Sequence, residues 1–510
     1  MTDLAPDPGP MPVSAVISRL LARRSNARGV LFSLIGAGAP AVLALLFLPR
    51  IAGALGTERF GILALAWTVI GYASFLHLGL GRAVARDTAA GAAPRGTALA
   101  ETVWTAALMT FAAGTAAGAL LFAFAPSLVG LLNVPAAMEH EAAMAVRVLA
   151  CALPFTVSTP VLSAVLEARR RFDLVSAVVV PSAVLTYLGP VVALEWTGGL
   201  VPLVAVLAAT RVLAWTGYLV LALREAPELR TPPAFRRHAA VPLLTFGGWT
   251  TVSAAVSPLL VYLDRFVVGG LVSAAAVAYY STAQEAVLRM GVVSGAVVGV
   301  LFPAFARAEQ GDGDRLAGLL ESGVDAVLLL VLPLTLLIAA FAGDLLHVWM
   351  GPAYGAAGEP VLAWLAVGLL VNGLAKVPSS MIQAVGRPDL TAKLHLVELP
   401  IFVGVLAVMV WEFGVAGAAV AWVARASADA AALYWIACRR VPGAREVARR
   451  AMWVVIAGAF GVAVLQVLPL LVERVAVIVI AGLCLAWVAR GVVGRRARQV
   501  AMVSPLTDPT

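Results

Sequence analysis

Charged residues are scarce in this chain. Asp, Glu, Lys and Arg make up 13% of its 510 residues, whereas 61% of them are hydrophobic. A soluble domain carries about 25% charged residues. A chain this poor in charge cannot cover a water-facing surface with polar groups, so most of its exterior is expected to face lipid. The composition therefore predicts an integral membrane protein without a soluble catalytic domain.

Cysteine and histidine, the usual metal ligands, are also few. The chain has three cysteines and five histidines. The cysteines lie inside apolar runs, are odd in number and fit no disulfide or metal-site spacing, so they are interpreted as small core residues. The sequence has no phosphate-binding loop, no nucleophile elbow and no dinucleotide-binding glycine motif. We therefore expect no cofactor, no bound metal and no enzymatic activity.

The net charge of +8 comes almost entirely from arginine, since Lys376 and Lys393 are the only lysines. In a soluble protein this excess would suggest a nucleic-acid partner. Here the basic residues fall mostly in short loops between apolar runs, where membrane topology explains them better. No nucleic acid is expected as a partner.

Long apolar runs recur along nearly the whole chain. A membrane-spanning helix needs about 20 mostly apolar residues. Fourteen runs meet this requirement, which predicts an all-α membrane protein with about fourteen transmembrane helices. The predicted spans are 29–49, 60–81, 97–125, 142–166, 175–195, 199–223, 241–268, 274–305, 322–343, 359–385, 393–412, 415–437, 451–469 and 472–490.

Loop charges give an independent test of this topology, because cytoplasmic loops collect Arg and Lys. With the amino terminus inside, most of the 36 basic residues fall in cytoplasmic segments. The opposite loops contain only Arg50, Arg59 and Arg474 and are otherwise acidic. Both termini are therefore predicted to be cytoplasmic, in the plasma (inner) membrane, with a disordered tail at 1–28 and a second tail at 491–510.

The two halves of the chain resemble each other. Leu48-Pro49-Arg50 closes the first span, and Leu263-Asp264-Arg265 lies near the end of the seventh. Six spans, an even number, separate the copies, so the repeats would be parallel. Parallel repeats are one of the known transporter plans.

Several ionisable residues lie deep in the predicted spans. Such residues are costly in lipid and usually face a partner or a cavity. Six of the nine are basic, and an interior with that excess would suit an anionic head group, because Arg forms forked hydrogen bonds with phosphate oxygens. The nine candidate substrate-cavity residues are Arg147, Arg211, Asp264, Arg265, Glu285, Arg289, Lys376, Arg425 and Asp429.

Two pairs among them are spaced four residues apart. Glu285 with Arg289, and Arg425 with Asp429, each share a helix face and could neutralise each other. For these four residues, pairing and substrate contact are equally good readings of the sequence.

The remaining charges divide by depth. Asp325 and Glu398 lie near span ends, which favours an ion pair or a side chain that snorkels to the interface. Arg211 and Lys376 lie deep with no acid within one helical turn, which favours contact with a cavity. The cluster of Tyr279, Tyr280 and Gln284 could hydrogen-bond a polyol or form an interfacial aromatic belt.

Short motifs in both halves resemble a known family. The run from Pro49 to Gly61 and the run from His77 to Arg86 resemble the start of Wzx-type polysaccharide flippases. In the second half, Asp264-Arg265, Ala278-Tyr279-Tyr280 and Phe302-Pro303-Ala-Phe-Ala-Arg307 are similar to the same family. These flippases belong to the superfamily of multidrug, oligosaccharidyl-lipid and polysaccharide exporters.

The resemblance implies two six-helix lobes at 29–223 and 241–437, with two further helices at 451–490. It implies alternating access of undecaprenyl-pyrophosphate-linked oligosaccharide across the membrane for surface polysaccharide synthesis. The family's cavity arginines would correspond to Arg211, Arg265 and Arg289, and less closely to Arg147. Polysaccharide polymerase and glycosyltransferases would be the protein partners.

Three alternatives remain open at this stage. A drug antiporter of the same fold often carries an acid in its first span, and residues 29–48 contain none. A lipid II flippase needs arginines near its first, second and eighth spans; Arg289 fits, but the first span has none in its interior. A membrane scaffold in envelope assembly would not need its intramembrane charges.

Overall fold

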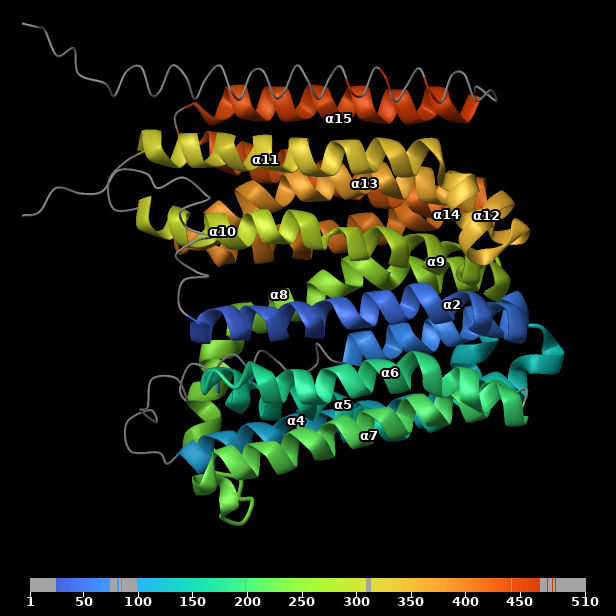
Figure 1. Cartoon of the computed structure of the whole chain (residues 1–510), viewed down its shortest axis with the longest axis vertical. Coiled ribbons are helices and arrows are strands. Elements are labelled where there is room, and N and C mark those ends of the chain that lie inside the picture. Colours follow the sequence, from blue (N-terminus) through green and yellow to red (C-terminus); the bar gives the residue numbers. More distant parts are fainter. Residues whose placement is uncertain are drawn as a thin grey trace, which may run out of the picture. The chain divides into compact units, whose positions relative to one another are not determined.

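The chain is built almost entirely of helices in the computed structural model. The structure describes residues 24–73, 80, 81, 84, 99–197, 199–308, 313–441 and 443–467, together with 475, 479 and 482. The helices in chain order are α2 (Arg24–Ala73), α4 (Leu99–Gly130), α5 (Ala136–Ala168), α6 (Phe172–Thr197), α7 (Leu200–Glu225), the 3₁₀ helix η2 (Pro227–Arg230), α8 (Arg237–Leu271), α9 (Ala274–Met290), α10 (Val292–Ala308), α11 (Gly313–Ala340), α12 (Ala342–Met350), α13 (Pro352–Ala384), α14 (Pro388–Cys438) and α15 (Ala444–Val467) (Figure 1).

The apolar runs of the sequence coincide with these helices. Nine helical segments of the described part are long and apolar enough to cross a membrane. In lipid the backbone must satisfy its own hydrogen bonds, so an apolar run of this length forms a helix. The prediction of an all-α, multi-pass membrane protein is confirmed. The tail at 1–23, most of the run 77–86, the span 472–490 and the tail 491–510 lie outside the described residues.

Two glycines divide long helices into pairs. Gly56 within α2 and Gly414 within α14 have positive φ angles of 74° and 57°, which L side chains rarely adopt. Each break falls between two of the predicted spans, as expected if α2 and α14 each contain two of them. At the second break a Cβ on Gly417 would lie 1.9 Å from the carbonyl oxygen of Met409, which shows how tightly the chain folds back.

The span predicted over 274–305 is present as the membrane-capable segment Ala274–Ala306, with a one-residue interruption at Gly291. Helix α9 ends at Met290, and α10 begins at Val292. Gly291 caps α9 with its backbone N–H directed at the carbonyls of Leu288 and Arg289. The interruption leaves a local disturbance of the backbone ladder in the middle of an otherwise apolar segment.

The chain divides into two compact units. The first contains Met1–Leu48, Leu76–Ala123 and Arg147–Gly247, and the second contains Pro49–Phe75, Phe124–Val146 and Gly248–Thr510. The second unit thus combines segments from both sequence halves. The lobes expected at 29–223 and 241–437 remain a prediction.

The core of the second unit lies around α13. Helix α13 packs against α9, α10, α11, α12, α14 and α15, and α11, α13 and α15 lie close together in Figure 1. Gly368 allows the closest approach, because a Cβ there would lie 2.1 Å from the ring of Trp422 on α14. In the first unit, α6 packs along α7.

Candidate functional site

A buried polar network joins α8 to α9 in the second unit. Asp264 and Arg265, adjacent on α8, are 0% and 2% exposed. A lone buried charge is costly, so such residues need partners with good geometry. The network described below supplies them.

Arg265 forms a hydrogen bond through each of its three guanidinium nitrogens. Its Nε donates to Gln284 at 2.6 Å, one Nη donates to Thr68 of α2 at 3.0 Å, and the other donates to Glu285 at 3.0 Å. The guanidinium also lies over the ring of Tyr262, 4.9 Å from its centroid. Each guanidinium nitrogen of Arg265 thus bonds to a protein group, which leaves it less capacity for a ligand than an arginine without an ion pair has.

Asp264 is equally well satisfied. It accepts hydrogen bonds from the hydroxyl of Tyr280, from Gln284 Nε2 at 2.7 Å and from the backbone N–H of Arg265 at 2.8 Å. Tyr280 is fully buried and Gln284 is 1% exposed. Burial of this degree contradicts an interfacial belt for these two side chains, whereas contact with a polyol stays a prediction. They hold Asp264 in place.

The outer part of the network reaches a less buried ion pair. Glu285 Oε2 pairs with Arg289 at 3.3 Å, and the two side chains are 30% and 27% exposed. The pairing alternative predicted from their spacing is therefore present. Glu285 links Arg265 to Arg289, so the network ends in a basic group at the edge of the buried region.

Backbone contacts close the second unit beside this network. We call them the seam: Asn133, which follows α4, and Gly61 of α2 meet the turn between α8 and α9. Asn133 donates its backbone N–H to Gly269 at 2.9 Å and its side-chain amide to Gly270 at 2.8 Å. A Cβ on Gly61 would lie 1.7 Å from the carbonyl oxygen of Ala274. The seam joins segments of the first sequence half to the second.

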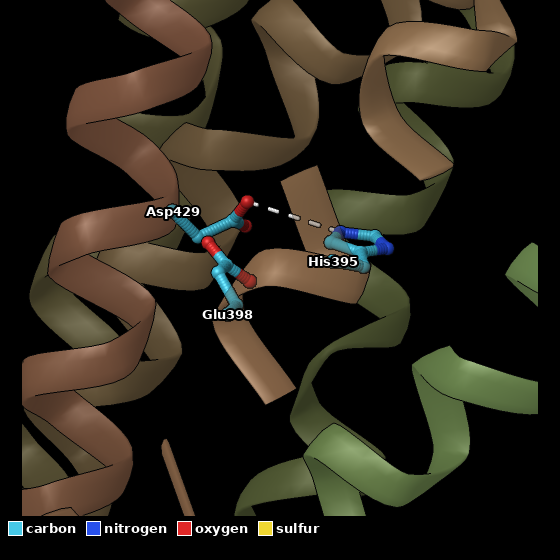
Figure 2. Close-up of side chains that lie close together, drawn as sticks. All are labelled: His395, Glu398 and Asp429. Carbon is cyan, nitrogen blue, oxygen red and sulfur yellow. Dashed lines mark ion pairs between the residues drawn. The ribbon is translucent and has the colours of Figure 1, made fainter. Parts of the chain in front are cut away.

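A second buried polar group lies within α14, across the fold at Gly414. His395 and Glu398 are on its first half, and Arg425 and Asp429 are on its second. His395 Nε2 is 3.8 Å from Asp429, and Arg425 is 3.8 Å from Glu398. Figure 2 shows the side chains of His395, Glu398 and Asp429 directed toward one another. The ion pairs of Arg425 and Asp429 therefore run between the two halves of α14.

The geometry of this group is loose. One potential ligand atom from each of His395, Glu398 and Asp429 lies within 4.8 Å of the others. Neither carboxylate oxygen of Glu398 has a hydrogen bond, although that residue is only 8% exposed. Of the described residues, these three are the group with the donor set of a metal site. We call His395, Glu398 and Asp429 the carboxyl–imidazole cluster.

Lys376 of α13 lies at the interruption between α9 and α10. Its ammonium donates to Ser294 Oγ at 3.2 Å and to the carbonyl oxygen of Gly291 at 3.4 Å. The carboxyl end of a helix carries partial negative charge, which favours a cation there. Lys376 therefore stabilises the break, and no carboxylate pairs with it among the described residues.

The first unit holds the other two candidate residues. Arg211 of α7 is partly buried, and its Nη donates to the neutral hydroxyl of Thr186 on α6 at 3.3 Å. Arg147 of α5 lies 5.5 Å from the ring centroid of Phe122. No ion pair involves Arg211 within the part of the chain that the structure describes. Arg211 therefore keeps more of its donor capacity than Arg265 does.

Residues near span ends are also buried within the protein. Asp325 of α11 is 6% exposed and pairs with Arg450 of α15, and Glu398 pairs with Arg425. Of the two possibilities considered for Asp325 and Glu398, the ion pair is therefore present rather than snorkelling.

Solved structures identify the class of the fold. The lipid II flippase MurJ in an inward closed conformation matches with a TM-score of 0.70 at 12% identity, over 91% of this chain and 99% of that one. The inward-facing conformation of a multidrug resistance MATE family transporter of the MOP superfamily matches with a TM-score of 0.65 at 15% identity, over 79% and 96%. The chain has the fold of these membrane transporters.

Sequence comparison identifies the family. The model of the family described as polysaccharide biosynthesis protein matches residues 51–359, more than half of the chain. A relative from Shigella flexneri, which carries the provisional name of O-antigen transporter, is 29% identical over 411 residues, or 80% of this chain and 96% of that protein. The chain belongs to the polysaccharide biosynthesis protein family, and the resemblance to Wzx-type flippases is confirmed.

Proposed function

We propose that the protein moves an undecaprenyl-pyrophosphate-linked oligosaccharide from the inner to the outer leaflet of the plasma membrane. Membership of the polysaccharide biosynthesis family supports a substrate of this class. The name of the Shigella flexneri relative supports it further. The process is transport by alternating access and requires no covalent chemistry.

The observation that carries the proposal is the state of Arg211. Its guanidinium lies in the middle of an apolar helix, opposite a neutral hydroxyl at 3.3 Å and without an ion pair in the described residues. Arginine forms forked, charge-assisted hydrogen bonds with phosphate oxygens. Arg211 is therefore the best of the candidate residues for holding a pyrophosphate, with Lys376 and Arg289 next.

The seam defines the accessible side under this proposal. With both termini cytoplasmic, as the loop charges predict, the loops that contain Asn133 and Gly270 lie toward the outside. The contacts Asn133–Gly269 and Gly61–Ala274 would then keep the outer side of the second unit closed. Export of the head group would require these contacts to separate once in each cycle.

The function of Arg211 is tested by replacing it with Ala. A strain that lacks its own copy of the protein is complemented with wild type, Arg211→Ala or Arg224→Ala, and cell-surface polysaccharide is measured against protein level. Arg224 is an exposed arginine at the end of the same helix and serves as the matched control. We expect Arg211→Ala to lose most of the export and Arg224→Ala to keep it. Normal export by Arg211→Ala at wild-type protein level would contradict the assignment.

The same strains separate this function from drug export. The proposal predicts that loss of the protein removes surface glycan and leaves drug tolerance unchanged. The opposite pattern would indicate a small-molecule antiporter of the same fold.

A further inference from the structure

The carboxyl–imidazole cluster of α14 is not used by the proposed substrate site. It lies between the two halves of that helix and is built from His395, Glu398 and Asp429, with Arg425 3.8 Å from Glu398. Glu398 and Asp429 are each 8% exposed. Buried charges of this kind persist only when they are balanced or when they perform a function.

The charges of the cluster do not balance. Two carboxylates and one guanidinium leave a net charge of −1 when the imidazole is neutral. An excess charge in a buried site costs free energy, because little water is present to solvate it. Binding one positive charge brings the group to neutrality. With a neutral imidazole, the cluster is therefore short of one positive charge.

The hydrogen bonding points to the same deficit. Both oxygens of Glu398 and Oδ1 of Asp429 are buried, and no donor of the described residues hydrogen-bonds to them. The nearest nitrogen atoms of Arg425 and His395 are 3.8 Å away, beyond hydrogen-bond distance. Two neighbouring carboxylates in a dry site share a proton readily, because the charge on one disfavours the charge on the other.

A proton fits this site better than a metal ion. The ligand atoms are spread over as much as 4.8 Å, and the Arg425 guanidinium adjoins Glu398. A positive guanidinium at that distance repels a metal ion. A proton needs one acceptor and no coordination shell. Arg425 also limits the deficit to one charge.

The charged groups around the cluster do not supply the missing positive charge. Arg425 acts electrostatically on the cluster. Helices α13 and α15 also pack against α14 and carry Lys376 and Arg450, which bond to Ser294 and Asp325 respectively.

We propose that Glu398 and Asp429 bind one proton between them, with His395 and Arg425 as the flanking groups. Binding is protonation of a carboxylate oxygen, and release is its deprotonation. The aqueous phase supplies the proton and receives it again.

The test is infrared difference spectroscopy of the reconstituted full-length protein between about pH 5 and about pH 9, the range over which buried carboxyl groups titrate. We expect acidification of the wild type to produce the C=O band of a protonated carboxyl group. Glu398→Gln and Asp429→Asn should each remove or shift that band. Asp389→Asn, on the first turn of the same helix and paired with Arg387, should leave it unchanged.

Absence of a titrating carboxyl band in the wild type would overturn the proposal, whether or not the variants fold. A band that survives both substitutions would overturn it as well. Displacement of the wild-type band by Na⁺ or Zn²⁺ at constant pH would instead identify a metal ion as the occupant. No substrate is present, so failure here leaves the proposed transport function standing.

Discussion

Two buried charged regions of the second unit make opposite use of the same residue types. In the network on α8 and α9, Arg265 and Asp264 bond to protein groups at 2.6–3.0 Å. In the cluster on α14, Arg425 is 3.8 Å from Glu398 and His395 is 3.8 Å from Asp429. A saturated network fixes a structure, whereas an unsaturated one retains the capacity to bind. Burial of a charge alone therefore does not identify a transport site.

The largest effect should follow from breaking the saturated network. Arg265→Ala removes the donor to Gln284 Oε1 and Thr68 and leaves Glu285 paired with Arg289 alone. Loss of one member of a buried ion pair lowers the free energy of unfolding by about 3–5 kcal/mol. Thermal unfolding of the purified protein, followed by tryptophan fluorescence, measures this. Arg289→Ala, which removes a partly exposed pair with Glu285, is the control and should cost no more than about 1 kcal/mol. Equal losses of stability in the two variants would contradict the prediction, because they would show that Arg265 stabilises the fold no more than Arg289 does.

A matched pair of isosteric changes compares the two regions directly. Asp264→Asn replaces a carboxylate that accepts three hydrogen bonds. It should lower the free energy of unfolding by about 1.5–3 kcal/mol. Asp429→Asn removes an unbalanced charge and should stay within about 1 kcal/mol of wild type. The midpoint of thermal unfolding orders the two variants. The comparison fails if Asp429→Asn is the less stable.

Overpacking the seam should have a smaller effect. Gly61→Ala places a methyl group against the carbonyl of Ala274, and forced overpacking costs about 1–3 kcal/mol. Gly71→Ala on the same helix has no atom within 4 Å and should change stability by no more than about 0.5 kcal/mol. Both are compared by thermal unfolding and by surface polysaccharide. If Gly61→Ala behaves like Gly71→Ala, the seam is not close-packed.

The sequence predicts the helices well for a physical reason. A segment that crosses lipid must be long and apolar, and its backbone groups must hydrogen-bond to one another. Hydropathy alone therefore locates the membrane helices. It also places the breaks at Gly56 and Gly414, since each falls in a loop between two predicted spans. The interruption at Gly291 could not be predicted, because the run 274–305 is apolar throughout and the contact from Lys376 comes from a distant helix.

The site is only partly readable from the sequence. Helical spacing identifies neighbours within one helix, as for Glu285 and Arg289. It does not say which helices face each other, so the partnership of Arg425 with Glu398 could not be found in this way. His395 carried no spacing signal at all. Thr68 and Asn133 are common polar residues, and only the fold reveals their contacts.

The central claim is that the protein carries a lipid-linked oligosaccharide across the membrane. The most direct test is depletion of the protein, followed by analysis of the undecaprenyl-pyrophosphate-linked glycans on each side of the membrane. The account predicts that one such glycan accumulates on the cytoplasmic side while surface polysaccharide falls, and that wild type but not Arg211→Ala reverses both changes. Undiminished surface polysaccharide, with no lipid-linked glycan accumulating inside, would contradict it.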